Sequence, residues 1–82
     1  MSFYQWIITQ TERRDPIGDL ARDILSDITF PKNYVLFKRI KGYLEPLACE
    51  DALDAFDNAW KEYQTALIHE ITGWKENHGN PL

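Results

Sequence analysis

Residues 15–24 read DPIGDLARDI, and this stretch decides the fold of the chain. Asp15 is a typical helix cap, because its carboxylate can accept hydrogen bonds from the free N–H groups of a first turn. Pro16 suits the first helical position, where its missing N–H group costs nothing. Apolar residues then recur at spacings of three and four, as in a helix with one buried face: Ile17, Leu20, Ala21, Ile24, Leu25 and Ile28. The stretch predicts a helix that runs to about Asp27.

Two further residues refine this helix. Gly18 lies in its first turn, where glycine costs about 1 kcal/mol relative to alanine, and its presence indicates the close approach of another helix. The helix is expected to end at residues 29–31, because the residue before Pro31 disfavours helical dihedral angles.

Signals of two more helices lie on either side. Ser2 and Gln5 have the spacing of a capping box, which predicts a short helix at the start of the chain. Asn33 is predicted to cap a third helix that ends at Leu44. The inward side of this third helix is expected to carry Leu36, Phe37, Ile40, Tyr43, Leu44 and Leu47.

The fourth predicted helix is the longest. Glu50 and Asp51 place negative charge at its start, where the helix dipole favours carboxylates. Its apolar stripe meets no proline or glycine until Gly73 and consists of Leu53, Phe56, Trp60, Tyr63, Leu67, Ile71 and Trp74. Such a helix would be about 35 Å long, too long for a core of three helices to cover. The part beyond Tyr63 is therefore expected to bend back, to project into solvent or to pack on a second chain.

Length and composition restrict the class of protein. A chain of 82 residues with 44% hydrophobic content makes one small folded domain, which the patterns above predict to be all-α. The longest apolar run, residues 34–37, is far shorter than the roughly 20 residues that cross a bilayer. The first residues do not have the pattern of a secretory signal, and the single cysteine, Cys49, cannot form an internal disulfide. We expect a cytoplasmic protein without membrane contact.

Several segments together resemble the YozE family of SAM-like bacterial domains. They are residues 2–6, 15–24, 30–32, 43–44 and 59–60, with Tyr63, and the DPIGDLARDI stretch is the most specific of them. The resemblance implies a compact SAM-like bundle of four to five helices in a small bacterial protein of unknown function, here with a long C-terminal helix. It also implies structural roles for the family-motif residues, which are Trp6, Asp15, Pro16, Gly18, Leu20 and Trp60. It implies no catalytic residue.

Two parts of the chain depart from the family pattern. Residues 34–37 are apolar where the family is polar, and the segment after Gln64 lies outside the resemblance. We therefore divide the chain into a SAM-like domain, residues 1–64, and a helical extension with a frayed tail, residues 65–82. Both departures are candidates for a partner surface peculiar to this protein.

The net charge of −4 conceals an uneven distribution. Residues 28–44 carry four basic and no acidic residues, whereas residues 45–82 carry eight acidic and two basic ones. The four cations form a candidate basic patch: Lys32, Lys38, Arg39 and Lys41. Such a patch can contact phosphates, although four cations in a chain with a pI near 5.0 make a weak electrostatic footprint. It can also pair with the aspartates that recur every four residues from Asp15 to Asp27, within one molecule or between molecules. A further alternative is that both charged faces are simply solvated.

Signals of catalysis or metal binding are weak. His69 and Glu70 begin a zinc-protease pattern, but Gly73 stands where the second histidine is required. Cys49 has no histidine close in sequence, and the acidic residues at the start of the fourth helix do not follow a calcium-loop pattern. We expect no enzyme activity, no cofactor, no metal and no small-molecule substrate.

The sequence predicts a small non-enzymatic protein–protein interaction module that binds a protein partner or self-associates. The partner-binding candidates lie on the long helix, because the core of a domain of this size is too small to cover their apolar side chains. They are Tyr63, Leu67, Ile71 and Trp74. The alternatives are a nucleic-acid-binding domain that uses the basic third helix, and an acidic nucleic-acid mimic that inhibits a basic partner.

Overall fold

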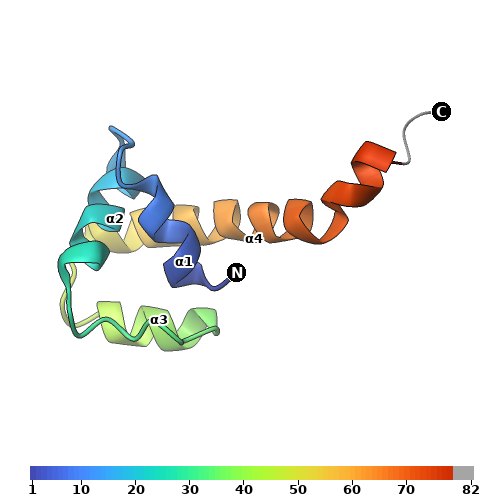
Figure 1. Cartoon of the computed structure of the whole chain (residues 1–82). Helices are drawn as coiled ribbons and strands as arrows, with labels where there is room; N and C mark the ends of the chain where they lie inside the picture. Colours follow the sequence, from blue (N-terminus) through green and yellow to red (C-terminus); the bar gives the residue numbers. More distant parts are fainter. Residues whose placement is uncertain (79–82) are drawn as a thin grey trace.

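The chain folds into helices joined by short loops (Figure 1). The computed structural model describes residues 1–78, with side chains through residue 71. Their order is α1 (Phe3–Ile7), the 3₁₀ turn η1 (Ile8–Gln10), α2 (Pro16–Ser26), α3 (Phe37–Leu44) and α4 (Glu50–His78). No strand occurs in this part of the chain. The all-α prediction is therefore confirmed. None of the described helices is both long enough and apolar enough to cross a membrane.

The helix starts follow the capping signals of the sequence. The Ser2 hydroxyl accepts a hydrogen bond from the Gln5 N–H (3.1 Å), and the Gln5 side chain accepts one from the Ser2 N–H (2.9 Å), which completes the capping box. Asp15 Oδ1 accepts a hydrogen bond from the Gly18 N–H at 2.9 Å, and Pro16 occupies the first position of α2. Both predicted starts are confirmed.

Helix α3 begins three residues later than predicted. Asn33 does not cap it; Leu36 does, in an extended conformation and without a side-chain hydrogen bond. The reason is that the Tyr34 N–H donates to the Pro31 carbonyl (3.1 Å), so residues 31–34 form a turn of their own. Leu36 and Leu47 were expected to face inward, but each is more than half exposed because it lies outside the ends of α3.

The apolar stripe of α2 is also shorter than predicted. Ile17, Leu20, Ala21 and Ile24 are buried, whereas Leu25 is 52% and Ile28 is 90% exposed. Helix α2 ends at Ser26, and Asp27 is extended, so Ile28 does not continue the helical face.

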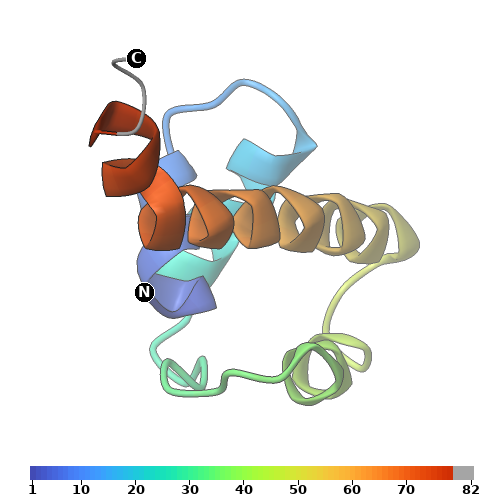
Figure 2. The ribbon, with the colours of Figure 1, turned by 90° about the vertical axis from the view of Figure 1, so that its right-hand side faces the viewer.

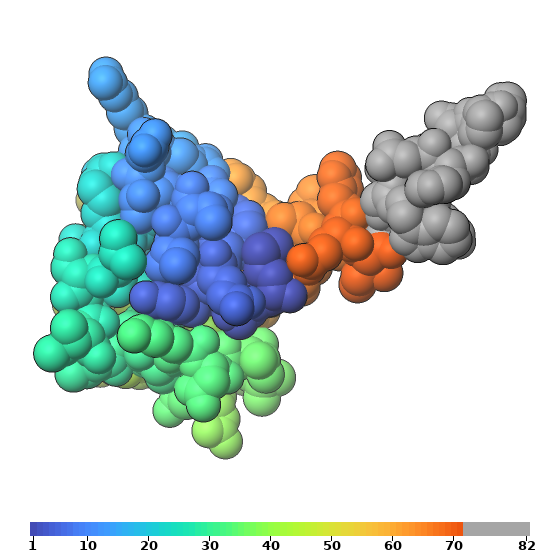
Figure 3. Space-filling model, in the orientation of Figure 1, coloured from blue at the N-terminus to red at the C-terminus, as the bar shows by residue number. Residues whose placement is uncertain are grey.

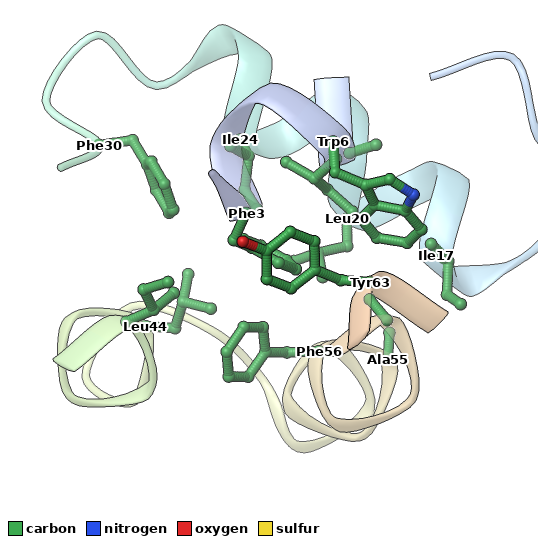
Figure 4. Close-up of a cluster of buried hydrophobic side chains, with 14 residues drawn as sticks. Phe3, Trp6, Ile17, Leu20, Ile24, Phe30, Leu44, Ala55, Phe56 and Tyr63 are labelled. Carbon is green, nitrogen blue, oxygen red and sulfur yellow. The ribbon is translucent and has the colours of Figure 1, made fainter. Parts of the chain in front are cut away.

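Phe3 is the centre of the core (Figure 4). Its ring meets Phe56 and Tyr63 edge to face, at centroid distances of 5.4 and 5.5 Å. Aromatic pairs in this geometry contribute about 0.5–1.5 kcal/mol beyond the burial of their area. Two of the family-motif side chains, Trp6 and Leu20, are buried, and Trp60 is half-buried against the same cluster. The remaining buried side chains are Ile7, Ile17, Ala21, Ile24, Phe30, Ile40, Leu44, Ala55 and Ala59.

Polar residues in and just before the DPIGDLARDI stretch hold α2 to its neighbours. Arg13 donates to Asp15 Oδ2 (2.7 and 3.0 Å) and to both carboxylate oxygens of Glu62 on α4 (2.7 and 3.2 Å). These bonds raise the pKa of the Arg13 guanidinium. The pKa of Asp15 is lowered, first by Arg13 and next by the hydrogen bond from Gly18. Arg22 donates to the carbonyls of Thr11 (2.6 Å) and Arg13 (3.0 Å).

Gly18 is present because of a close approach, but by a loop and not by another helix. A Cβ atom on Gly18 would lie 2.1 Å from the Arg13 carbonyl oxygen. The loop before α2 thus folds directly over its first turn. The expected helix contact is corrected to this loop contact.

Helix α4 is the element on which α1, α2 and α3 all pack. Figures 1 and 2 show α4 running through the whole molecule, with its C-terminal end extending past the other helices. Of the three outcomes expected for the segment beyond Tyr63, the projecting one is observed. The helix continues through Gly73 to His78, and the rest of the predicted tail lies outside the described residues.

Candidate interaction surfaces

The four predicted partner-binding residues of α4 differ in how far they are buried. Tyr63 is only 5% exposed, and its hydroxyl donates to the Met1 carbonyl at 2.7 Å. Burial raises the pKa of Tyr63, with the charge of Glu70 adding to the effect. Leu67 is half-buried against the core, and Ile71 is 69% exposed. The side chain of Trp74 lies outside the described residues. Tyr63 is therefore a core residue, and the accessible part of the stripe begins at Leu67.

The segment from residue 65 to residue 71 extends beyond the body of the molecule (Figure 3, orange). We call this segment the arm. Its one described ion pair joins Glu70 to the Met1 ammonium group at 3.3 Å, and the Glu70 side chain is half exposed. An exposed pair of this kind contributes about 0–1 kcal/mol. The arm is therefore held by the continuation of α4 and by the packing of Ala66 and Leu67 against the core.

The four residues of the predicted basic patch do not converge on one point. Lys32 lies over the Tyr4 ring at 5.6 Å, and Arg39 lies over the Tyr34 ring at 5.8 Å. Lys41 lies over the Phe37 ring at 5.5 Å. Lys38 is exposed. Cations stacked on exposed rings gain about 0.5–1 kcal/mol, so the patch is built of cations and aromatic rings together.

Lys41 also approaches an acidic residue of α4. Its Nζ atom is 3.5 Å from Asp57 Oδ1, which is buried and accepts no hydrogen bond among the described residues. The distance makes this an ion pair, but the geometry is not that of a hydrogen bond, so we regard the contact as weak. Lys41 thus points toward α4 and away from the other cations of the patch.

Two tyrosines and two cations meet in one shallow hollow on α3. Its volume is about 340 Å³, and it is lined by Tyr34, Lys38, Arg39, Gly42 and Tyr43. Tyr43 is held there by α2, because its hydroxyl donates to Asp27 Oδ2. That hydrogen bond and those from Thr29 lower the pKa of Asp27, and the same bond raises the pKa of Tyr43.

The aspartates of α2 are not neutralised by the basic patch. Asp15 pairs with Arg13, Asp19 with Arg22, and Asp27 accepts from hydroxyl groups. Within the described residues, no ion pair joins α2 to Lys32, Lys38, Arg39 or Lys41. The expected pairing of the patch with these aspartates within one molecule is therefore not observed.

A third surface is an apolar groove that the sequence reasoning missed. It consists of two hollows of about 290 and 180 Å³ that share Leu20, Asp23, Cys49 and Ala52. The groove lies between α2 and the first turns of α4, and the end of α3 closes one side. The aspartates of α2 were visible in the sequence as a row, but the apolar floor depends on how the loop after α3 packs. No local sequence pattern predicts that packing.

The residues considered for catalysis and metal binding are scattered. Cys49 and His69 are both exposed, at opposite ends of the long helix. In the described part of the chain, no group of three or more His, Cys, Asp or Glu residues is placed to hold a metal ion.

Comparison with known proteins shows which family the chain is related to. The family model described as "YozE SAM-like fold" matches residues 2–65. A UPF0346 protein of Streptococcus mutans is 40% identical over 65 residues, which are 76% of this chain and 92% of that protein. A UPF0346 protein of Streptococcus pyogenes serotype M28 is 36% identical over 80 residues, 94% of this chain and 93% of that protein. The second alignment takes in most of the segment after Gln64. No solved structure matches the chain.

Proposed function

The chain belongs to the YozE SAM-like family, and from this premise we propose that it is a small non-enzymatic protein–protein interaction module. The observation that carries the proposal is the apolar stripe of α4. Its members are buried or half-buried as far as Leu67 and exposed at Ile71. The stripe thus extends farther along α4 than the core that covers it. Exposed apolar faces of this kind mark sites of association.

The occupant that we propose for the exposed part of the stripe is a second copy of this chain. A second copy supplies an apolar face of the same length and spacing, and two such faces can pack on each other about a two-fold axis. Full burial of one isoleucine side chain contributes about 1.5–3 kcal/mol, and the contribution occurs once on each copy.

The test is the solution mass of the full chain by light scattering over a concentration series. We expect the mass to rise above the monomer value of 9.6 kDa as concentration increases, and Ile71→Asp to remove the rise. The matched control is His69→Asp, because His69 is exposed on the same arm but lies about 200° around the helix from Ile71. A wild-type chain that stays monomeric throughout, or an equal effect of both substitutions, would contradict the proposal.

Two further parts of the proposal concern the location of the protein and its domain boundaries. We propose a cytoplasmic location, which is supported by a lone cysteine that cannot form a disulfide within the chain. We also propose that residues 1–64 are the SAM-like domain and residues 65–82 its extension, which is supported by the end of the family match at residue 65.

The second candidate function is nucleic-acid binding by α3. It is favoured by the hollow that contains Tyr34, Tyr43, Lys38 and Arg39, since aromatic rings stack on bases while cations contact phosphates. A titration of labelled single-stranded oligonucleotide at two salt concentrations tests it. Binding that weakens with salt and is lost in Lys38→Glu would favour this function. The acidic-mimic alternative predicts instead that the chain competes with nucleic acid for a basic protein.

A further inference from the structure

The groove between α2 and α4 combines an apolar floor with an acidic rim. Its floor and walls carry Leu20, Ile24, Phe30, Leu44, Leu47 and Ala52. Leu47 lines the larger hollow and is 67% exposed. One wall of the groove is therefore an apolar side chain in contact with solvent. Phe30 and Leu44 face the same space from the α2–α3 loop and from α3 (Figure 4). The larger hollow, at about 290 Å³, has room for a large apolar side chain.

The charged residues of the rim are all acidic. The charged residues that line the two hollows are Asp19, Asp23, Asp27 and Asp51, and no lysine, arginine or histidine lines either hollow. Asp19 is engaged by Arg22, and Asp27 by Tyr43 and Thr29. Asp23 and Asp51 are exposed, and no ion pair engages them within the described residues. Carboxylates that face each other across an apolar trough attract cations from solution and repel anions.

We propose that this groove binds a basic amphipathic segment of a partner protein. A leucine or phenylalanine of the segment fills the larger hollow beside Leu47. Lysines or arginines on either side of that anchor reach Asp23 on α2 and Asp51 on α4. Apolar anchoring in a groove with a charged rim is a common mode of peptide recognition. The charges give the complex its orientation and speed of association, and the apolar anchor gives it much of its lifetime.

This binding surface is separate from the self-association of the proposed function. The groove reaches Ala55 in the second turn of α4, and Ile71 is 16 residues away, about 24 Å along the helix. The two surfaces can therefore be occupied independently. An Ile71→Asp chain is expected to bind the peptide as well as the wild type does.

The experiment uses a labelled synthetic peptide of about four helical turns built from leucine and lysine at helical spacing. Fluorescence anisotropy measures its affinity for the full chain. Two matched peptides replace every lysine by glutamate, or every leucine by serine. We expect saturable binding of the first peptide and at least about tenfold weaker binding of the other two, because each lacks one of the two recognition elements.

Protein variants distinguish the groove from general attraction between opposite charges. Asp23→Lys and Leu47→Ser are each expected to weaken binding at least about tenfold. Asp54→Lys makes the same charge change on an exposed residue of α4 that lines neither hollow, and it is the control. Equal weakening by Asp23→Lys and Asp54→Lys would overturn the proposal, since it would show attraction by net charge alone.

Cys49 supplies an independent readout inside the groove. It lines both hollows and is the only cysteine of the chain. Its alkylation by iodoacetamide, a neutral reagent, is expected to slow at least about fivefold when the leucine–lysine peptide is saturating. An unchanged rate at saturation would overturn the proposal. So would protection of Cys49 that increases with protein concentration when no peptide is present, because the occupant would then be a second copy.

Discussion

Gly18 offers the sharpest test of the fold, because the structure predicts opposite effects for the same substitution at two glycines. A Cβ atom at Gly18 would lie 2.1 Å from the Arg13 carbonyl oxygen and 2.7 Å from the Arg13 carbonyl carbon. At Gly42, in α3, a Cβ atom would meet nothing within 4 Å. Both glycines are helical with negative φ, so alanine is conformationally acceptable at each position. The steric contact is the difference between them.

The magnitude follows from that contact. To reach ordinary contact distance the Arg13 carbonyl must retreat by roughly 1 Å or more. This movement strains the hydrogen bond from Arg22 to the same carbonyl and the cap between Asp15 and the Gly18 N–H. Overpacking costs about 1–3 kcal/mol and a lost cap about 0.5–2 kcal/mol, while the helix propensity of alanine returns about 1 kcal/mol. We expect a net loss of about 0.5–4 kcal/mol for Gly18→Ala and a gain of up to about 1 kcal/mol for Gly42→Ala.

The assay is thermal and urea unfolding followed by far-ultraviolet circular dichroism. For a chain of this length, 1 kcal/mol corresponds to about 4–8 °C in Tm. Gly18→Ala is therefore expected to melt roughly 10 °C below the wild type and Gly42→Ala a few degrees above it. A Gly18→Ala chain that melts at or above the wild-type temperature would refute the reasoning that places the loop over α2.

Three further predictions concern the core, the pH dependence and the Arg13 contacts. Phe56→Ala removes a fully buried ring that touches Phe3 and is expected to lower the free energy of unfolding in urea by about 3–5 kcal/mol; a loss below 1 kcal/mol would contradict its central place. The lowered pKa of folded Asp27 means that its stabilisation is present above the unfolded value of 3.8 and is lost as pH falls through the folded value. The stability difference between wild type and Asp27→Asn should therefore shrink in unfolding curves recorded from pH 6 down to pH 3, and a constant difference would exclude this role. Glu62→Gln removes a half-exposed partner of Arg13 and is expected to cost at most about 1 kcal/mol, less in 1 M NaCl; a cost independent of salt would argue against an ion pair.

Local signals predicted the helix starts well. The caps at Ser2 and Asp15 are short-range features, because each cap joins a side chain to a backbone group three residues away. The long helix was also predictable, since its stripe repeats without a proline or glycine through residue 72. Failures occurred where a turn competed with a helix. At residues 31–34 a local hydrogen bond between Tyr34 and Pro31 replaced the predicted cap at Asn33.

The candidate surfaces were predictable only in part. The exposure of Ile71 follows from the length of α4 relative to a small core, so the sequence already pointed to the arm. The spacing of the stripe places Tyr63 at a core position, but its hydrogen bond to the Met1 carbonyl was not predictable, because the two residues are 62 positions apart in sequence. The groove was missed for the same reason. Its walls come from α2, α3 and α4, and only their packing brings Asp23, Leu47 and Asp51 together.

The continuity of α4 fixes more than the length of the arm. Because the core and the arm share one helix, each residue inserted between Tyr63 and Leu67 would turn the arm by about 100° relative to the domain and move it about 1.5 Å outward. One inserted residue would therefore aim Ile71 in a new direction, whereas seven would nearly restore its original direction at a distance about 10 Å greater. The number of residues in the helix thus determines how a partner bound to the arm is oriented relative to a partner bound to the domain.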